Sequence, residues 1–189
     1  SPTSRRGTRS PSTPLGSIEN PVSACAFALG AGARFVARSI DTLQAHLIAT
    51  LKRAQGHRGA SFIEILQNCV VFNDAVFENI TGKEVAPDAQ VLVEHSKPLL
   101  FGKNKEKGLR LKPGKLELEI VPAAPDVLVH DETNRPLAQL LAALEPPFPV
   151  AMGVLYCNPA TSYEREVVVG SGGSLDALLN GERTWEVVP

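Results

Sequence analysis

Residues 59–74 read GASFIEILQNCVVFND, and this stretch says most about how the chain folds. Phe62 to Leu66 is a short apolar run that starts after a glycine and ends in polar residues, which is typical of a buried strand. The polar turn that follows presents a cysteine, Cys69. Functional groups of α/β proteins gather at the carboxyl ends of sheet strands, so Cys69 is the first candidate functional residue.

Upstream of this strand, the pattern predicts a βαβ unit. Residues 34–39 are apolar enough for a short strand. Asp41 is placed to cap a helix whose apolar residues recur at helical spacing, namely Leu43, Leu47, Ile48, Leu51 and Ala54. Strand, helix and strand with short connections predict parallel neighbours and a right-handed crossover. An earlier helix over residues 22–29 is expected to start at Asn20-Pro21 and to end at Gly30.

After Asp74 the pattern changes to short β segments separated by Lys-Gly and Pro-Gly turns. These segments are residues 91–93, 99–101, 109–111 and 116–121. They predict a small antiparallel appendage. A helix over residues 136–144, a strand over 149–156 and a final helix from Ser174 are also expected.

The predicted fold class is therefore α/β, with a parallel βαβ sheet and a small β-rich C-terminal appendage. Residues 1–21 are rich in Ser, Thr, Pro, Arg and Gly and are expected to form a poorly ordered loop. Residues 22–76 are expected to hold the βαβ sheet, and residues 77–189 a mixed, β-rich subdomain.

Composition narrows the range of functions. Apolar residues make up 43% of the chain and the net charge is −1, so we expect neither a polybasic nucleic-acid surface nor extensive disorder. No apolar run approaches the roughly 20 residues of a membrane span. Three cysteines without regular spacing do not indicate a disulfide framework, and a reduced, cytoplasmic setting is expected.

Five motifs follow one another along the chain: SPTS (1–4), STPLGS (12–17), LGAGARFVAR (29–38), HRG (57–59) and ILQNCVVFND (65–74). In wording and order they resemble the β subunit of 2-oxoacid:ferredoxin oxidoreductases, above all that of the 2-oxoglutarate type. Residues 98–102 and 181–185 resemble later family segments, and the match is patchy beyond Phe77. One departure is Ala75, where many members have glycine.

The resemblance implies part of a fold that binds thiamine diphosphate, Mg²⁺ and a [4Fe–4S] cluster. It also implies that Cys69 is one cluster ligand in the intact subunit, although a lone cysteine read from spacing alone is more often a buried apolar residue. Cys25 and Cys157 are expected to be buried. Ser1, Thr3 and Ser4 are implied to lie in a loop close to the cofactor and substrate, where hydroxyl and backbone N–H groups could bind an anion.

The activity implied is oxidative decarboxylation of a 2-oxoacid to acyl-coenzyme A, with electrons passed to ferredoxin. 2-Oxoglutarate is the expected substrate and pyruvate its main rival. The implied partners are the α subunit of the enzyme and ferredoxin. The family segments that hold magnesium and diphosphate are not in this sequence, so the chain is interpreted as the C-terminal part of the subunit and is expected to be inactive alone. The alternative is a non-catalytic binding or assembly domain, or a degenerate remnant that keeps only the fold.

Other candidates are weaker. His130-Asp131 has the composition of an acid/base pair, but an exposed turn is the commoner setting for such neighbours. Residues 103–107 are expected to form a charged hairpin tip that is solvated, with docking of an acidic ferredoxin as a second interpretation.

Overall fold

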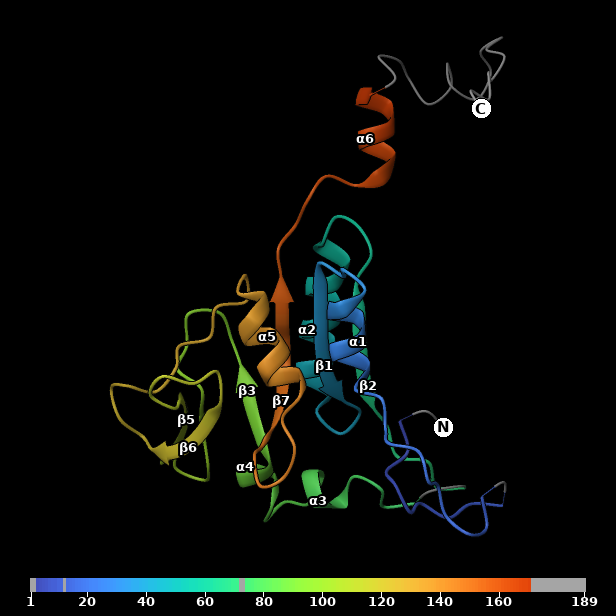
Figure 1. Ribbon diagram of the computed structural model, residues 1–189, viewed down its shortest axis with the longest axis vertical. Helices are drawn as coiled ribbons and strands as arrows, with labels where there is room; N and C mark the ends of the chain where they lie inside the picture. Colours follow the sequence, from blue (N-terminus) through green and yellow to red (C-terminus); the bar gives the residue numbers. More distant parts are fainter. Residues whose placement is uncertain (1–2, 12, 72–73, 171–189) are drawn as a thin grey trace.

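The computed structural model describes residues 3–11, 13–71 and 74–170, and its centre is a four-stranded mixed sheet (Figure 1). The strands β1 (Phe35–Ile40), β2 (Phe62–Leu66), β3 (Gln90–Val93) and β7 (Val150–Cys157) lie in the order β2-β1-β7-β3. β1 and β2 are parallel, with Val36 opposite Phe62 and Ile40 opposite Leu66. β7 runs antiparallel to β1 and parallel to β3. The predicted parallel pair and its α/β class are confirmed.

Helices cover both faces of this sheet because alternate residues of β1 point to opposite sides. Helices α1 (Ala24–Gly30) and α5 (Arg135–Ala142) contact each other and cover one face, where Val36 joins the main apolar core. Helix α2 (Gln44–Gly56) connects β1 to β2 and covers the other face, where Phe35 and Ala37 pack near Ala54. The strand–helix–strand reading of residues 34–66 is therefore confirmed.

A second sheet forms the appendage that the turn-rich sequence predicted. Strands β4 (Leu100–Phe101), β5 (Lys107–Leu111) and β6 (Leu118–Pro122) are antiparallel, with Leu109 opposite Ile120. Its apolar side chains join the main core through Leu99, Phe101 and Leu109. The appendage therefore packs onto the larger sheet through a shared core.

Three short helices complete the described part: α3 (Glu78–Thr81), α4 (Ala86–Ala89) and α6 (Tyr163–Gly170). Figure 1 shows α6 standing off the body of the protein, beyond the end of β7. Among the residues that the structure describes, no helix is long and apolar enough to cross a membrane.

The structure corrects several boundaries. Helix α1 begins at Ala24 and its cap is Ser23, whose hydroxyl accepts from the Ala26 N–H at 3.4 Å, so Asn20 is not the cap. Helix α2 begins at Gln44 after Leu43, which gives no side-chain cap, so Asp41 is not its cap either.

β3 was expected in the appendage, but it pairs with β7 in the main sheet. This sheet therefore combines strands from both sides of the boundary expected between residues 76 and 77. The helix expected from Ser174 lies outside the described residues.

A buried ion pair links the elements of the main sheet. The Arg38 guanidinium donates to a carboxylate oxygen of Glu64 at 2.6 Å, and the two side chains are 8% and 18% exposed. The guanidinium also lies 3.4 Å from the Ala142 carbonyl oxygen, the last residue of α5, and 3.5 Å from that of Ala151. Arg38 therefore ties β1 to β2 and to β7 while providing a donor for the carbonyl end of α5, which has no intrahelical partner.

Candidate functional site at the carboxyl ends of β1 and β2

The carboxyl ends of the two parallel strands are joined by backbone contacts. The Asp41 N–H, just after β1, donates to the Leu66 carbonyl oxygen at 3.1 Å. The Asn68 N–H, just after β2, lies 3.4 Å from a carboxylate oxygen of Asp41. Asp41, expected to cap α2, instead holds the start of the turn that carries Cys69.

The turn is closed by Asp74. One of its carboxylate oxygens accepts from the Asn68 side-chain amide at 2.8 Å and from the Ala75 N–H at 2.9 Å. The Asn68 bond, followed by the Ala75 bond, lowers the pKa of the Asp74 carboxyl. Ala75 has φ +56°, a left-handed conformation that costs residues other than glycine free energy. Ala75 therefore stands where the backbone conformation favours glycine, the residue that many proteins with the similar motif have at this position.

Cys69 lies on the surface of this turn. Cys69 is exposed, and the next two residues, Val70 and Val71, are 74% and 76% exposed. Three consecutive exposed apolar or thiol side chains are unusual on a surface that faces only water, and they mark contact surfaces. The position at the end of β2 is the one predicted from the sequence.

The other two cysteines have different surroundings. Cys25 is fully buried in α1, and burial raises the pKa of its thiol to about 12. Its sulfur lies 3.3 Å from a Glu64 carboxylate oxygen. Cys157, at the end of β7, is half-buried, and burial also raises the pKa of its thiol. Burial was correctly predicted for Cys25 and is partial for Cys157.

The N-terminal loop lies at the same end of the molecule as the carboxyl end of β2 (Figure 1). Within it, the Gly7 N–H donates to the Ser17 carbonyl oxygen at 2.7 Å and the Ser17 N–H to the Thr8 carbonyl oxygen at 3.0 Å. Thr3 is exposed and Ser4 is half-buried, whereas Ser1 lies outside the described residues. The roles expected for Ser1, Thr3 and Ser4 stay predictions.

Among the described residues, no group of three or more His, Cys, Asp or Glu side chains is arranged to hold a metal ion. An iron–sulfur cluster needs several thiolates, usually four. An exposed Cys69 therefore fits the role of one ligand in a set that other cysteines would have to complete.

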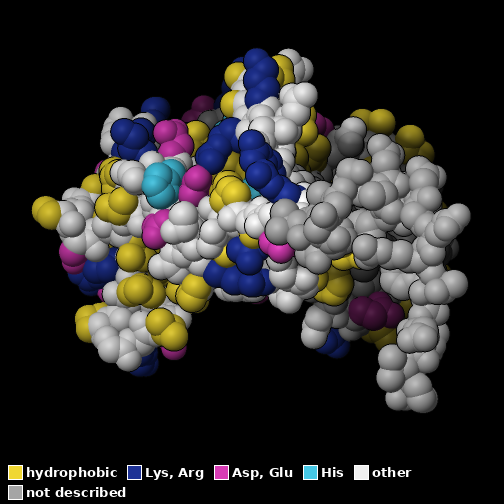
Figure 2. All heavy atoms as spheres, turned by 90° about the horizontal axis from the view of Figure 1, so that it is seen from above, with side chains coloured by type: hydrophobic (Ala, Val, Ile, Leu, Met, Phe, Trp, Pro, Cys, Tyr) yellow, Lys and Arg dark blue, Asp and Glu magenta, His cyan; other side chains and the backbone are white. Residues whose placement is uncertain are grey.

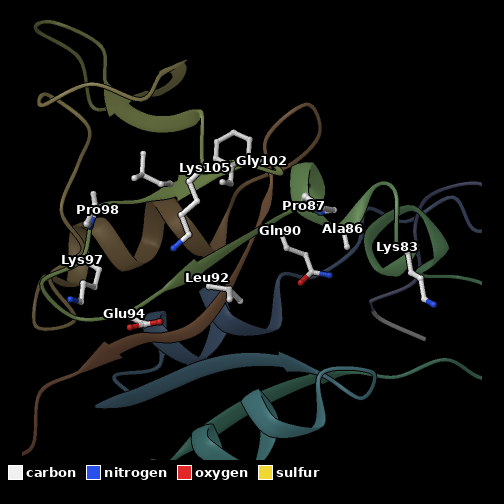
Figure 3. Close-up of a pocket in the computed structure, with 12 residues that line it drawn as sticks. Lys83, Ala86, Pro87, Gln90, Leu92, Glu94, Lys97, Pro98, Gly102 and Lys105 are labelled. Atoms are coloured by element: carbon white, nitrogen blue, oxygen red, sulfur yellow. The ribbon is translucent and has the colours of Figure 1, made fainter.

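A groove beside β3 is a second feature that the sequence did not reveal. It has a volume of about 530 Å³ and lies between β3, β4 and α4, with Lys83, Lys97 and Lys105 in its wall (Figure 3). Figure 3 shows the Lys105 side chain extending into the groove above Leu92. Lys105 belongs to the charged tip expected at residues 103–107, whereas Lys83 and Lys97 come from other segments, so the sequence did not place the three lysines together. Lys107, in the predicted charged tip, instead pairs with Asp88 at 2.8 Å.

His130 and Asp131 do not form an exposed acid/base pair. His130 is fully buried, its Nε2 lies 2.8 Å from the Val154 carbonyl oxygen, and burial lowers its pKa. The Asp131 carboxylate accepts from the Thr133 hydroxyl at 2.7 Å. The exposed turn expected for His130 is therefore wrong, because this residue packs under β7.

Comparisons with known proteins agree with the motifs. Over 135 residues, 69% of this chain, the sequence is 40% identical to 2-oxoglutarate oxidoreductase subunit KorB of Mycobacterium tuberculosis. It is 40% identical over 74 residues to the β subunit of 2-oxoacid:ferredoxin oxidoreductase 1 of Aeropyrum pernix, and 35% identical over 72 residues to 2-oxoglutarate synthase subunit KorB of Methanocaldococcus jannaschii. These matches cover 35%, 23% and 27% of the three relatives. No protein-family profile matches the chain.

A solved structure shares the fold. It is a 2-oxoglutarate:ferredoxin oxidoreductase from Magnetococcus marinus with 2-oxoglutarate, coenzyme A and succinyl-CoA bound. The superposition gives a TM-score of 0.62 at 20% identity and covers 97% of this chain and 52% of that one. At this identity the likeness is one of fold.

The chain shares its mixed α/β fold with this 2-oxoglutarate:ferredoxin oxidoreductase. In sequence it resembles the β subunits of 2-oxoacid:ferredoxin oxidoreductases, and the 2-oxoglutarate type in particular. It spans about a third of the length of its mycobacterial relative.

Proposed function

We propose that this chain is the C-terminal part of the thiamine-diphosphate-binding β subunit of a 2-oxoacid:ferredoxin oxidoreductase that acts on 2-oxoglutarate. The observation that carries the proposal is the exposed Cys69 at the carboxyl end of β2, inside the segment ILQNCVVFND. The 40% identity to the mycobacterial subunit supports it. The partners in this proposal are the α subunit, ferredoxin, the 2-oxoacid and coenzyme A.

Cys69 would supply one thiolate of a [4Fe–4S] cluster. When bound, such a cluster transfers single electrons, and thiamine diphosphate with Mg²⁺ supplies the electron sink for decarboxylation. In this chain, Asp41 and Asp74 shape the backbone on either side of Cys69 through their bonds to Asn68. Their part is to hold the turn so that the thiol faces outward.

The surface around β2 has the features of a surface that another subunit covers. β2 is an edge strand of the main sheet, and it contacts both α1 and α2. Apolar side chains on these three elements are exposed: Phe27 by 70%, Ile48 by 53% and Ile65 by 43%. Apolar groups that flank an open sheet edge mark interaction surfaces.

The proposal is tested in the intact oxidoreductase. Cys69→Ala should lower the iron content, the visible absorbance of the cluster and the reduction of ferredoxin together. Cys157→Ala is the matched control, because Cys157 lies at the far end of the sheet, and it should leave all three unchanged. Full iron content and full ferredoxin reduction in Cys69→Ala would show that this cysteine is no cluster ligand.

A further inference from the structure

A basic cavity lies at the end of the sheet opposite Cys69. Its volume is about 800 Å³, and its wall comes from three segments: residues 32–34 before β1, residues 57–60 before β2, and residues 160–165 after β7. Figure 1 shows these segments at the amino ends of β1 and β2, below α6. The cavity is therefore separate from the turn that carries Cys69.

The charge of the cavity is positive and not balanced locally. Arg34, Arg58 and Arg165 line it, and no described Asp or Glu does. Among the described residues, neither Arg58 nor Arg165 pairs with a carboxylate, in contrast to the paired Arg38, Arg53 and Arg110. Viewed from this end, Figure 2 shows Lys and Arg side chains near the middle of the surface, with some Asp and Glu side chains beside them. Three guanidinium groups without counter-charges predict an anionic ligand.

Backbone N–H donors add to the arginines. The first turn of α6 borders the cavity, and a helix start carries N–H groups without intrahelical partners and a partial positive charge. His57 also lines the cavity, and its ring packs on Phe35 with centroids 5.4 Å apart. The Nδ1 atom of His57 is buried without a hydrogen-bond partner among the described residues. The N–H groups at the start of α6 therefore add to the arginines as donors for a ligand, whereas the Nδ1 atom of His57 is covered by protein.

An aromatic ring completes the wall. Tyr163 borders the cavity and is 80% exposed, so its ring is open to contact with a ligand. Guanidinium groups bind phosphate oxygens bidentately, and an aromatic face stacks on a planar base. A cavity of this volume is large enough for a nucleotide.

We infer that this cavity binds a phosphate-bearing small molecule of nucleotide size. Arg58 and Arg165, with Arg34, bind its phosphates, and Tyr163 stacks on its base. The inference does not depend on the proposed function, because it uses other residues at the other end of the sheet.

The test measures binding of adenosine diphosphate and inorganic pyrophosphate to the 189-residue chain by titration calorimetry. Arg58→Gln and Arg165→Gln should each weaken both probes about tenfold, the usual effect of losing one charge-assisted hydrogen bond to phosphate. Tyr163→Ala should weaken adenosine diphosphate alone, because pyrophosphate has no base. Lys115→Gln, an exposed cation in the β5–β6 turn, is the matched control and should change neither affinity.

Arg58, Arg165 and Tyr163 are all exposed, so the three variants should keep the melting temperature of the parent chain. Thermal unfolding followed by circular dichroism checks this. The inference is overturned if neither probe binds at millimolar concentration, or if the arginine variants bind both probes as well as the parent chain. It is also overturned if duplex DNA binds through these arginines while neither small anion does.

Discussion

Removing one member of the Arg38–Glu64 pair should destabilise the protein strongly. The pair is largely buried, and the guanidinium also contacts two backbone carbonyl oxygens, so Glu64→Leu leaves a positive charge in the core without its carboxylate. Breaking a buried pair from one side costs about 3–5 kcal/mol. Since Glu64 is 18% exposed, we expect a value near the lower limit, about 3 kcal/mol.

The double variant should behave differently. Arg38→Met alone should cost about 4 kcal/mol, because it leaves the Glu64 carboxylate without its cation and removes the guanidinium contacts to the Ala142 and Ala151 carbonyl oxygens, of which Ala142 keeps the Ser23 hydroxyl as a donor at 3.2 Å. Arg38→Met with Glu64→Leu removes both charges and should cost only about 1–2 kcal/mol, the share that belongs to the lost carbonyl bonds. The two single effects should therefore be strongly non-additive.

Urea unfolding at pH 7, followed by far-ultraviolet circular dichroism, measures these free energies. Lys112→Gln serves as the control, because the Lys112–Glu117 pair is exposed and contributes little. If the double variant lost as much stability as the two single variants combined, the pair would not be coupled. The reading of Arg38 and Glu64 as a buried ion pair would then be refuted.

Three further outcomes are expected. Ala75→Gly should stabilise the chain by about 1 kcal/mol, because glycine adopts the positive φ of that turn without strain, and a higher urea midpoint would show it. Burial lowers the pKa of His130, so the folded protein binds fewer protons than the unfolded chain, and stability should fall as pH drops below the unfolded value of about 6.5. His130→Gln should make the free energy of unfolding less dependent on pH in this range. An unchanged dependence would show that His130 is not its cause. Cys69 should react with a thiol reagent much faster than Cys25, whose thiol is buried with a pKa of about 12, and mass spectrometry of partly modified protein measures the order.

The βαβ unit could be read from the sequence because its signals are local. The apolar run of β2 and the helical spacing of apolar residues in α2 are each visible within one short segment. Both predicted elements are present in the structure. The cap predicted at Asp41 failed because the Asp41 side chain contacts the N–H of Asn68, which lies in the turn after β2. No local pattern encodes such a choice.

The rest of the fold and site depends on contacts between distant residues. β3 reads like the strands of the appendage, and only its pairing with β7 assigns it to the main sheet. Cys69 was found because one segment holds both its strand and its turn. The basic cavity was missed because Arg34, Arg58 and Arg165 come from three separate segments.

The strand order of the main sheet has a consequence for how the chain acquires its structure. Among the described residues β7 is the last strand along the chain, yet it lies between β1 and β3 and pairs with both. During synthesis, β1 and β2 can pair as soon as α2 has formed, whereas β3 has no strand partner until β7 leaves the ribosome. Such long-range closure slows folding and leaves open strand edges in the growing chain. In a nascent chain that stops before residue 150, the edges of β1 and β3 that β7 joins in the complete sheet would both stay unpaired.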